Sequence, residues 1–311
     1  MSVNAIVTIP PYAPYIGEVA KHPFVSGVRI NTVMPIKEPL EEMLNRIKGE
    51  VGDKDVWLDL KARQIRVTNF ASSPYQHLEI SHNIKVDTPV TAYFSDGEEE
   101  ATIARVDGKR IIMLDGPKRV VGPGESINIP DESLSIEGFL TDKDKEYVAA
   151  AKKVGIHTYM LSYVEEKSDV TDFLKRDPDA QILAKIESRK GLDFAKNVYS
   201  GFGDNVNLMT ARGDLYVEVK RPHLIVNAVK TIAAKDSNAV LASRLFPSLR
   251  SNRVPCAQDI SDASYMLDIG YKRFMIGDDI CFNRESLLSA LNILDAIVKD
   301  HRPLDYYKAQ N

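Results

Sequence analysis

A lysine and a glutamate stand two residues apart at the end of an apolar segment. Residues 182–188 read Ile-Leu-Ala-Lys-Ile-Glu-Ser, and the alternation of side chains along a strand would put Lys185 and Glu187 on the same face as Leu183. Lys and Glu are rarely buried unless they are paired. The pattern therefore indicates either a structural ion pair or a functional site.

The next apolar segment, residues 207–213, leads into a second carboxylate. It ends in Ala-Arg-Gly-Asp, so that Asp214 emerges where Glu187 emerges from the preceding strand. Two carboxylates, completed by substrate oxygens and waters, suit a hard divalent cation such as Mg²⁺. Backbone N–H groups at Arg212 and Gly213, near a helix start, would form an anion site. A surface turn is the structural alternative for this Arg-Gly-Asp.

Several cationic and polar residues follow the second and third apolar segments. Arg29 and Asn31 end the second, while Asp59, Lys61 and Arg66 lie along the third. Each alone is typical of a solvated surface charge. Together with Lys185 they predict a cationic site for an anionic substrate, a phosphate or a carboxylate.

These residues belong to a regular series of short, β-branched apolar runs separated by helical patterns, which favours βα units around a parallel sheet. The eight runs are residues 5–9, 28–31, 56–65, 157–163, 182–188, 207–213, 239–244 and 273–277. The helical patterns are residues 16–21, 39–48, 142–154, 169–174, 192–198, 222–234, 257–267 and 284–298. This α/β pattern predicts a (β/α)₈ TIM barrel with its active site at the carboxyl ends of the strands.

One interval breaks the series. Residues 67–131 contain short alternating strands at 91–94, 102–106 and 110–114, with Asp-Gly turn pairs between and after them. We expect a small β domain inserted after the third strand, flanked by barrel segments 1–66 and 132–300 and followed by a tail, 301–311. The helix that resumes the barrel is marked by Thr141 and Asp144 at its start and Gly155 just past its end.

Composition narrows the function classes. The 311 residues carry 40 Lys and Arg against 44 Asp and Glu, a net charge of −4, which argues against nucleic acid or an anionic membrane as partner. The two cysteines fit a reducing compartment, and neither a secretory signal nor an apolar run of spanning length is found, so we expect a cytoplasmic protein. The six histidines show no metal-ligand spacing, and there is no Walker loop or strand-linked GxGxxG.

The motifs together resemble the pyruvate kinase family over nearly the whole chain. Ala-Lys-Ile-Glu and Thr-Ala-Arg-Gly-Asp-Leu resemble its signature, and Arg29-Ile30-Asn31 resembles its Arg-Leu-Asn. Asp59 to Arg66 resembles Asp-Thr-Lys-Gly-Pro-Glu-Ile-Arg, and Ala242 to Leu245, Ala-Ser-Arg-Leu here, resembles Ala-Thr-Gln-Met.

The resemblance implies a barrel with a β lid that binds phosphoenolpyruvate or pyruvate on Mg²⁺ or Mn²⁺. Lys185, with Arg29 and Lys61, would be catalytic, stabilising the phosphoryl group and the enolate, and Glu187 and Asp214 would hold the metal. The substrate-binding residues would be Arg212 and Gly213 through their N–H groups, the Ser243 hydroxyl, Asn31 and Arg66.

Several positions depart from the family pattern. Val33 and Met34 replace a serine and a histidine, and Leu60 replaces a threonine, so a dependence on potassium is doubtful. The inserted domain is shorter than usual, and the residues after the eighth helix are too few for the family's C-terminal regulatory domain.

Three functions follow from these observations. The first is an unregulated phosphotransferase that moves phosphoryl from phosphoenolpyruvate to ADP or another nucleotide. The second is a metal-dependent lyase, aldolase or decarboxylase on a pyruvate-type 2-oxo acid. The third is a catalytically silent metabolite-binding homologue, against which the joint retention of Lys185, Glu187, Asp214 and Arg29 argues. A small-molecule substrate is the expected partner, and a homo-oligomer is left open.

Overall fold

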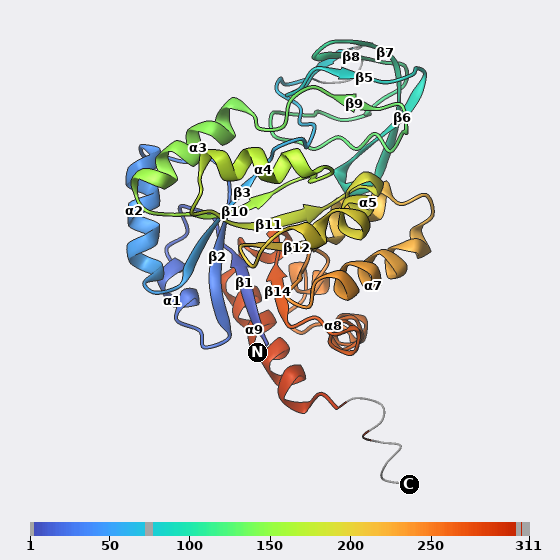
Figure 1. The fold of residues 1–311 in the computed structure, drawn as a ribbon. Helices are drawn as coiled ribbons and strands as arrows, with labels where there is room; N and C mark the ends of the chain where they lie inside the picture. The colour runs from blue at the N-terminus through green and yellow to red at the C-terminus, as the bar shows by residue number, and fades with distance from the viewer. Residues whose placement is uncertain (1–2, 72–76, 303–305, 307–311) are drawn as a thin grey trace.

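The computed structural model describes residues 3–71, 77–302 and 306, and its central element is a closed barrel of eight parallel strands (Figure 1). The strands pair in the order β1-β14-β13-β12-β11-β10-β3-β2. Their bounds are β1 Asn4–Thr8, β2 Val25–Asn31, β3 Asp55–Leu60, β10 Thr158–Leu161, β11 Gln181–Ile186, β12 Val206–Ala211, β13 Val240–Ala242 and β14 Arg273–Ile276. The predicted (β/α)₈ barrel is confirmed.

Helices follow the strands and cover the outside of the barrel. Within the described ranges they are α1 Ile16–Ala20, α2 Leu40–Val51, α3 Asp142–Lys153, α4 Lys167–Arg176, α5 Arg189–Asn197, α6 Arg212–Glu218, α7 Ile225–Lys235, α8 Ala257–Ile269 and α9 Arg284–Asp300. No helix in this part of the chain has both the length and the apolar character to cross a bilayer.

The residues between β3 and α3 form small antiparallel sheets that stand out from one end of the barrel (Figure 1). A four-stranded sheet has the order β4-β8-β7-β6, and β5 pairs with β9. The bounds are β4 His77–Glu79, β5 Ile84–Lys85, β6 Val90–Phe94, β7 Glu99–Asp107, β8 Arg110–Met113 and β9 Ser135–Ile136. We call this part the lid. Its expected boundaries, after residues 66 and 131, stay predictions.

The barrel interior is filled by one apolar layer below the carboxyl ends of the strands. Its members point inward from seven of the eight strands: Ile6, Trp57, Met160, Leu183, Met209, Val240, Ala242 and Met275. Because strand side chains alternate, residues two positions further along, such as Asp59 and Lys185, also face inward at the barrel mouth. Gly27 lies beside the indole of Trp57, where a Cβ would be 3.0 Å from the ring.

Several predicted strands are shorter than expected, and the third and the sixth differ at their carboxyl ends, next to the barrel mouth. The third was predicted to run to residue 65, but β3 ends at Leu60 because the side chain of Asp144 accepts hydrogen bonds from the N–H groups of Lys61 (2.9 Å) and Ala62 (3.0 Å). Ala62 then turns with φ +43°. The sixth was predicted to end at Gly213, but β12 ends at Ala211 and α6 begins at once.

The start of α3 is locally encoded as predicted. The hydroxyl of Thr141 accepts from Asp144 N (3.1 Å), and the Asp144 carboxylate accepts from Thr141 N (2.9 Å), which makes a capping box. Gly155, just past the helix, has φ +69°. The same Asp144 therefore starts α3 and fixes the end of β3, where the chain leaves for the lid.

Candidate active site at the barrel mouth

A single buried carboxylate holds three cations at the mouth of the barrel. Asp59, at the end of β3, has no exposed surface and forms ion pairs with Arg29, with Lys61 Nζ (2.6 Å) and with Lys185 Nζ (3.1 Å). The cations come from β2, the end of β3 and β11. The barrel closure therefore brings together charges that lie up to 156 positions apart in the sequence.

The pKa values of the residues in this cluster are shifted in different directions. Burial alone would raise the pKa of Asp59, but Arg29, Lys185 and Lys61 hold it well below its usual range. Burial and the neighbouring cations Arg66, Lys185 and Arg29 outweigh the attraction of Asp59 and lower the pKa of Lys61 to about 7. The pKa of Lys185 is raised, because Asp59 and Glu187 together outweigh its burial.

Lys185 and Glu187 face the same cleft, as the alternation predicts. Lys185 Nζ lies 3.0 Å from Glu187 Oε1 and donates to Ser162 Oγ (2.8 Å). The other oxygen of Glu187 accepts from the backbone N–H of Tyr163 (2.9 Å), which has φ +50°. Burial raises the pKa of Glu187 to about 7, with Lys185 opposing the rise and Asp214 adding to it.

Asp214 is held by amides from the two segments that join the lid to the barrel. Gln64 Nε2 donates to Asp214 Oδ2 (2.9 Å), and Asn128 Nδ2 donates to Asp214 Oδ1 (3.0 Å). The hydroxyl of Tyr163 accepts from Asn128 (2.6 Å) and donates to Asp214 (3.3 Å). The orientation of this carboxylate thus depends on both connections to the lid.

The opposite wall carries a second acid against Arg29. Asp278, after β14, accepts from Arg29 Nη1 (2.8 Å) and from Asn31 Nδ2 (3.2 Å to each oxygen). Arg29 also donates to Thr8 Oγ1 (2.9 Å). Arg29 is thereby fixed between Asp59 and Asp278, with 4% of its surface exposed.

The residues of the predicted carboxylate cradle lie close together, where the start of α6 approaches the turn after β13. A Cβ placed on Gly213 would lie 3.6 Å from Ser243 Oγ, so the start of α6 faces that hydroxyl closely. The first N–H groups of a helix have no partner within the helix. The Arg212 side chain turns away: its guanidinium makes two bonds to Asp262 (2.8 and 2.9 Å) and one to Ser243 O (3.1 Å).

A cleft of about 1010 Å³ opens between this mouth and the lid. Nine of the ten predicted site residues line it: Arg29, Asn31, Lys61, Arg66, Lys185, Glu187, Gly213, Asp214 and Ser243. Arg212 does not line it. Arg66 lies on the lid side of the cleft, where its guanidinium donates to Gln64 Oε1 and to the carbonyl of Gly124.

Sequence reasoning missed four residues that hold the site: Gln64, Asn128, Tyr163 and Asp278. Tyr163 and Asp278 each lie two residues past the end of a barrel strand, β10 and β14, where the carboxyl-end rule could have found them. Gln64 and Asn128 lie in the connections to the lid, and no spacing rule indicates that their amides reach Asp214.

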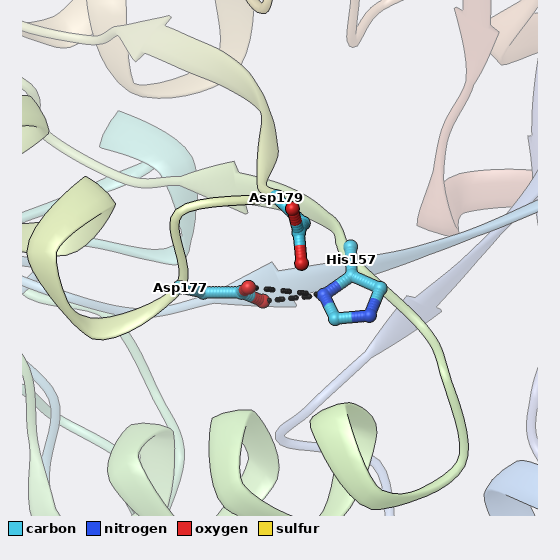
Figure 2. Close-up of side chains that lie close together, drawn as sticks. All are labelled: His157, Asp177 and Asp179. Carbon is cyan, nitrogen blue, oxygen red and sulfur yellow. Dashed lines mark hydrogen bonds and ion pairs between the residues drawn. The ribbon is translucent and has the colours of Figure 1, made fainter.

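A second group of metal-type ligands lies at the other end of the barrel, before β10 and β11 (Figure 2). His157 Nδ1 faces the carboxylate of Asp177 (3.0 and 2.9 Å), and Asp179 lies beside them. Asp177 also accepts from Tyr159 OH (2.8 Å). The His157–Asp177 pair therefore ties the two loops together, an arrangement that the sequence spacing of the histidines did not indicate.

Comparisons with known proteins agree with this geometry. A family model described as "Pyruvate kinase, barrel domain" matches residues 76–276. The chain is 26% identical to a pyruvate kinase of Thermoplasma acidophilum over 84% of its own length and 51% of the relative's. It is 25% identical to a pyruvate kinase of Borreliella burgdorferi over 91% of its own length and 65% of the relative's. It is 22% identical to a pyruvate kinase of Thermotoga maritima over 70% of its own length and 47% of the relative's. This chain thus spans about half to two thirds of these relatives and belongs to the pyruvate kinase family.

Proposed function

We propose that this chain is a divalent-metal-dependent phosphotransferase that acts on phosphoenolpyruvate and pyruvate through an enolate, with ADP or another nucleotide as acceptor. The observation that carries the proposal is the position of Lys185. Lys185 is 6% exposed and lines the cleft that Asp214 also lines, and its ammonium is kept charged by Asp59 and Glu187. A fixed cation beside two carboxylates suits the stabilisation of charge that develops on a substrate.

The donor set at the mouth fits a hard divalent cation. Glu187 and Asp214 both line the cleft, and their mutual repulsion adds to the burial that raises the pKa of Glu187. A cation between such carboxylates would relieve this repulsion, and oxygen ligands are those that Mg²⁺ and Mn²⁺ prefer. When bound, the metal would supply positive charge to oxygen atoms of the substrate.

Residues of the chain would stabilise the developing charge and hold the substrate. Lys185 would stabilise the enolate oxygen and the phosphoryl group, and Arg29 would neutralise phosphate charge. Lys61 would add a third positive charge. The N–H groups of Arg212 and Gly213 and the Ser243 hydroxyl would hold the substrate carboxylate. Asn31 and Arg66 would orient the substrate from the two sides of the cleft.

We further propose that activity needs no potassium. Leu60 is fully buried and packs in the apolar layer between barrel and helices, where it offers no oxygen ligand. Val33 and Met34 line the cleft with apolar side chains. Gln64 stands where the family motif has a glutamate, and its neutral amide donates a hydrogen bond to Asp214.

A metal-dependent lyase or decarboxylase on a pyruvate-type 2-oxo acid is the second candidate. The same carboxylates, lysine and carboxylate cradle would serve an enolate formed by breaking a carbon–carbon bond. The apolar Val33 and Met34 favour this candidate, because they line the cleft where the resembling family has a serine and a histidine.

A coupled assay separates the two candidates. Phosphoenolpyruvate, Mg²⁺ or Mn²⁺ and a series of nucleoside diphosphates are supplied, and pyruvate formation is followed for the wild type and for Lys185→Met. The proposal predicts acceptor-dependent pyruvate formation that Lys185→Met loses. Failure with every acceptor, together with metal-dependent decarboxylation of oxaloacetate, would replace it with the lyase.

A further inference from the structure

The turn after β13 is held in a strained conformation at the cleft. Three residues other than glycine have left-handed backbones there: Ser243 (φ +67°), Arg244 (φ +56°) and Phe246 (φ +52°). Such conformations cost about 1–3 kcal/mol each and persist where the surroundings enforce them. Arg212, itself fixed by Asp262, holds the first two of these residues by donating to the carbonyls of Ser243 and Arg244 (3.1 Å each). The turn therefore presents Ser243 and Arg244 side by side.

The side chain of Arg244 is placed by an aromatic ring. Its guanidinium carbon lies 4.2 Å from the ring centroid of Tyr216, on α6, a cation–π contact that orients the planar group. Arg244, Tyr216 and Arg250 all line the cleft. The fixed guanidinium is thus offered to the cleft rather than packed away from it.

These two arginines differ from the cations deeper in the mouth. Arg29, Lys61 and Lys185 are each paired with carboxylates. Among the residues that the structure describes, neither Arg244 nor Arg250 has a carboxylate oxygen within ion-pair distance, 4.0 Å. Arg244 donates to the backbone carbonyl of Asp96 (3.5 Å). At longer range Arg244 acts on the Asp96 carboxylate and both arginines act on Asp279, where they oppose the rise in pKa that burial causes. Their positive charge is available to a ligand.

The size of the cleft leaves room for such a ligand. Pockets for drug-sized molecules measure about 300–1,000 Å³, and this cleft measures about 1010 Å³. A three-carbon acid held at Gly213 and Ser243 would fill only a small part of it. The space next to the acid is bordered by Arg244, the residue that directly follows Ser243.

We propose that Arg244 and Arg250, with Tyr216, form a second anionic subsite beside the carboxylate cradle. It adds affinity for a longer 2-oxo acid, or its enol phosphate, that carries a second carboxylate at the far end of its carbon chain, beside the pyruvate and phosphoenolpyruvate that the cradle alone would bind. Arginine recognises a carboxylate through two parallel hydrogen bonds, which makes it specific for such a group. This inference rests on the proposed function, because the cradle at Gly213 and Ser243 places the first carboxylate.

Two acids of equal chain length test the subsite. 2-Oxoglutarate has a distal carboxylate and 2-oxovalerate lacks it, and the affinity of each is measured by calorimetry in the presence of Mn²⁺. The wild type should bind 2-oxoglutarate about tenfold to a hundredfold more tightly than 2-oxovalerate, which is the gain in affinity expected from a charge-assisted hydrogen bond. Arg244→Gln and Arg250→Gln should each bring this ratio toward one. Arg253→Gln, an exposed arginine of the same loop that does not line the cleft, should leave it unchanged.

The outcomes separate this inference from the function on which it rests. Pyruvate that fails to bind the wild type with Mn²⁺ overturns the proposed function. Pyruvate that binds, with no preference for the diacid or with a preference that survives both substitutions, overturns the subsite alone. So does a loss of ADP affinity in Arg244→Gln with the diacid ratio unchanged, which would assign the arginine to a nucleotide phosphate. If Arg244→Gln fails to fold, Arg250→Gln decides.

Discussion

Asp59 and Lys185 form the central ion pair of the barrel mouth: Lys185 Nζ lies 3.1 Å from Asp59 Oδ1, while the other oxygen of Asp59 accepts from Arg29 and Lys61. One carboxylate thus neutralises part of three buried positive charges. Glu187 and Asp278 add a second carboxylate to Lys185 and to Arg29, respectively. Asp59 therefore fixes the positions of the three cations that an anionic substrate would meet.

Replacing Asp59 should destabilise the fold strongly. In Asp59→Asn the three cations lose their shared partner while staying buried, and breaking a buried ion pair costs about 3–5 kcal/mol. Urea unfolding measures the free energy change. Asp142→Asn is the matched control, because Asp142 pairs with Lys145 in full solvent and its loss should hardly alter stability. Equal effects of the two substitutions would show that the Asp59 cluster is not a structural centre.

Anion binding should weaken as the pH rises through neutrality. The pKa of Lys61 is about 7, so the side chain is charged below that pH and neutral above it. We expect the affinity for oxalate to fall between about pH 6 and about pH 9 in the wild type, and to fall less in Lys61→Gln. Calorimetry at several pH values measures this. Identical pH profiles for the two proteins would contradict the assignment.

The same shift predicts how stability depends on pH. Above pH 7 the folded protein has released the Lys61 proton, whereas the unfolded chain keeps it up to about pH 10.4. The unfolded state binds more protons in this window, so this group makes the fold more stable as the pH rises. In Lys61→Met that contribution should disappear. A stability curve unchanged by the substitution between these pH values would refute it.

The lid should influence metal binding through Asn128. Its amide orients Asp214, and partners that orient metal ligands typically change metal affinity by about 10–100-fold when removed. Asn128→Ala should weaken Mn²⁺ binding by an amount in this range, measured by electron paramagnetic resonance. Asn83→Ala serves as the control, since Asn83 lies in the same lid and donates to Glu137 at the surface. Equal Mn²⁺ affinities in all three proteins would exclude the coupling.

Most of the barrel could be predicted because strands covered on both faces are nearly continuous apolar runs, as in Ile182–Ile186 and Val206–Ala211. The carboxyl ends of several runs could not be predicted. Residues 61–65 look like a continuing strand, yet the side chain of Asp144, more than 80 positions away, captures the N–H groups of Lys61 and Ala62. A pattern within one segment carries no information about such a distant acceptor.

In the candidate site, too, contacts within one strand could be predicted and contacts between distant segments could not. Alternation correctly placed Lys185 and Glu187 together, because both lie on one strand. The partners of Asp214 depend on where the lid connections pass, so Gln64 and Asn128 were missed. Arg212 was singled out for its N–H group, and the structure adds that its side chain is fixed to Asp262, which no spacing between them indicates.

The exchange of pyruvate methyl protons with solvent tests the central claim most directly, because it reports the enolate whatever the acceptor. Pyruvate is incubated in D₂O with Mg²⁺ or Mn²⁺, with and without ATP or inorganic phosphate, and followed by proton NMR. We predict metal-dependent exchange by the wild type and its loss in Lys185→Met, with the fold of both proteins checked by circular dichroism. Absence of exchange under every condition, or an equal rate in Lys185→Met, would contradict the account.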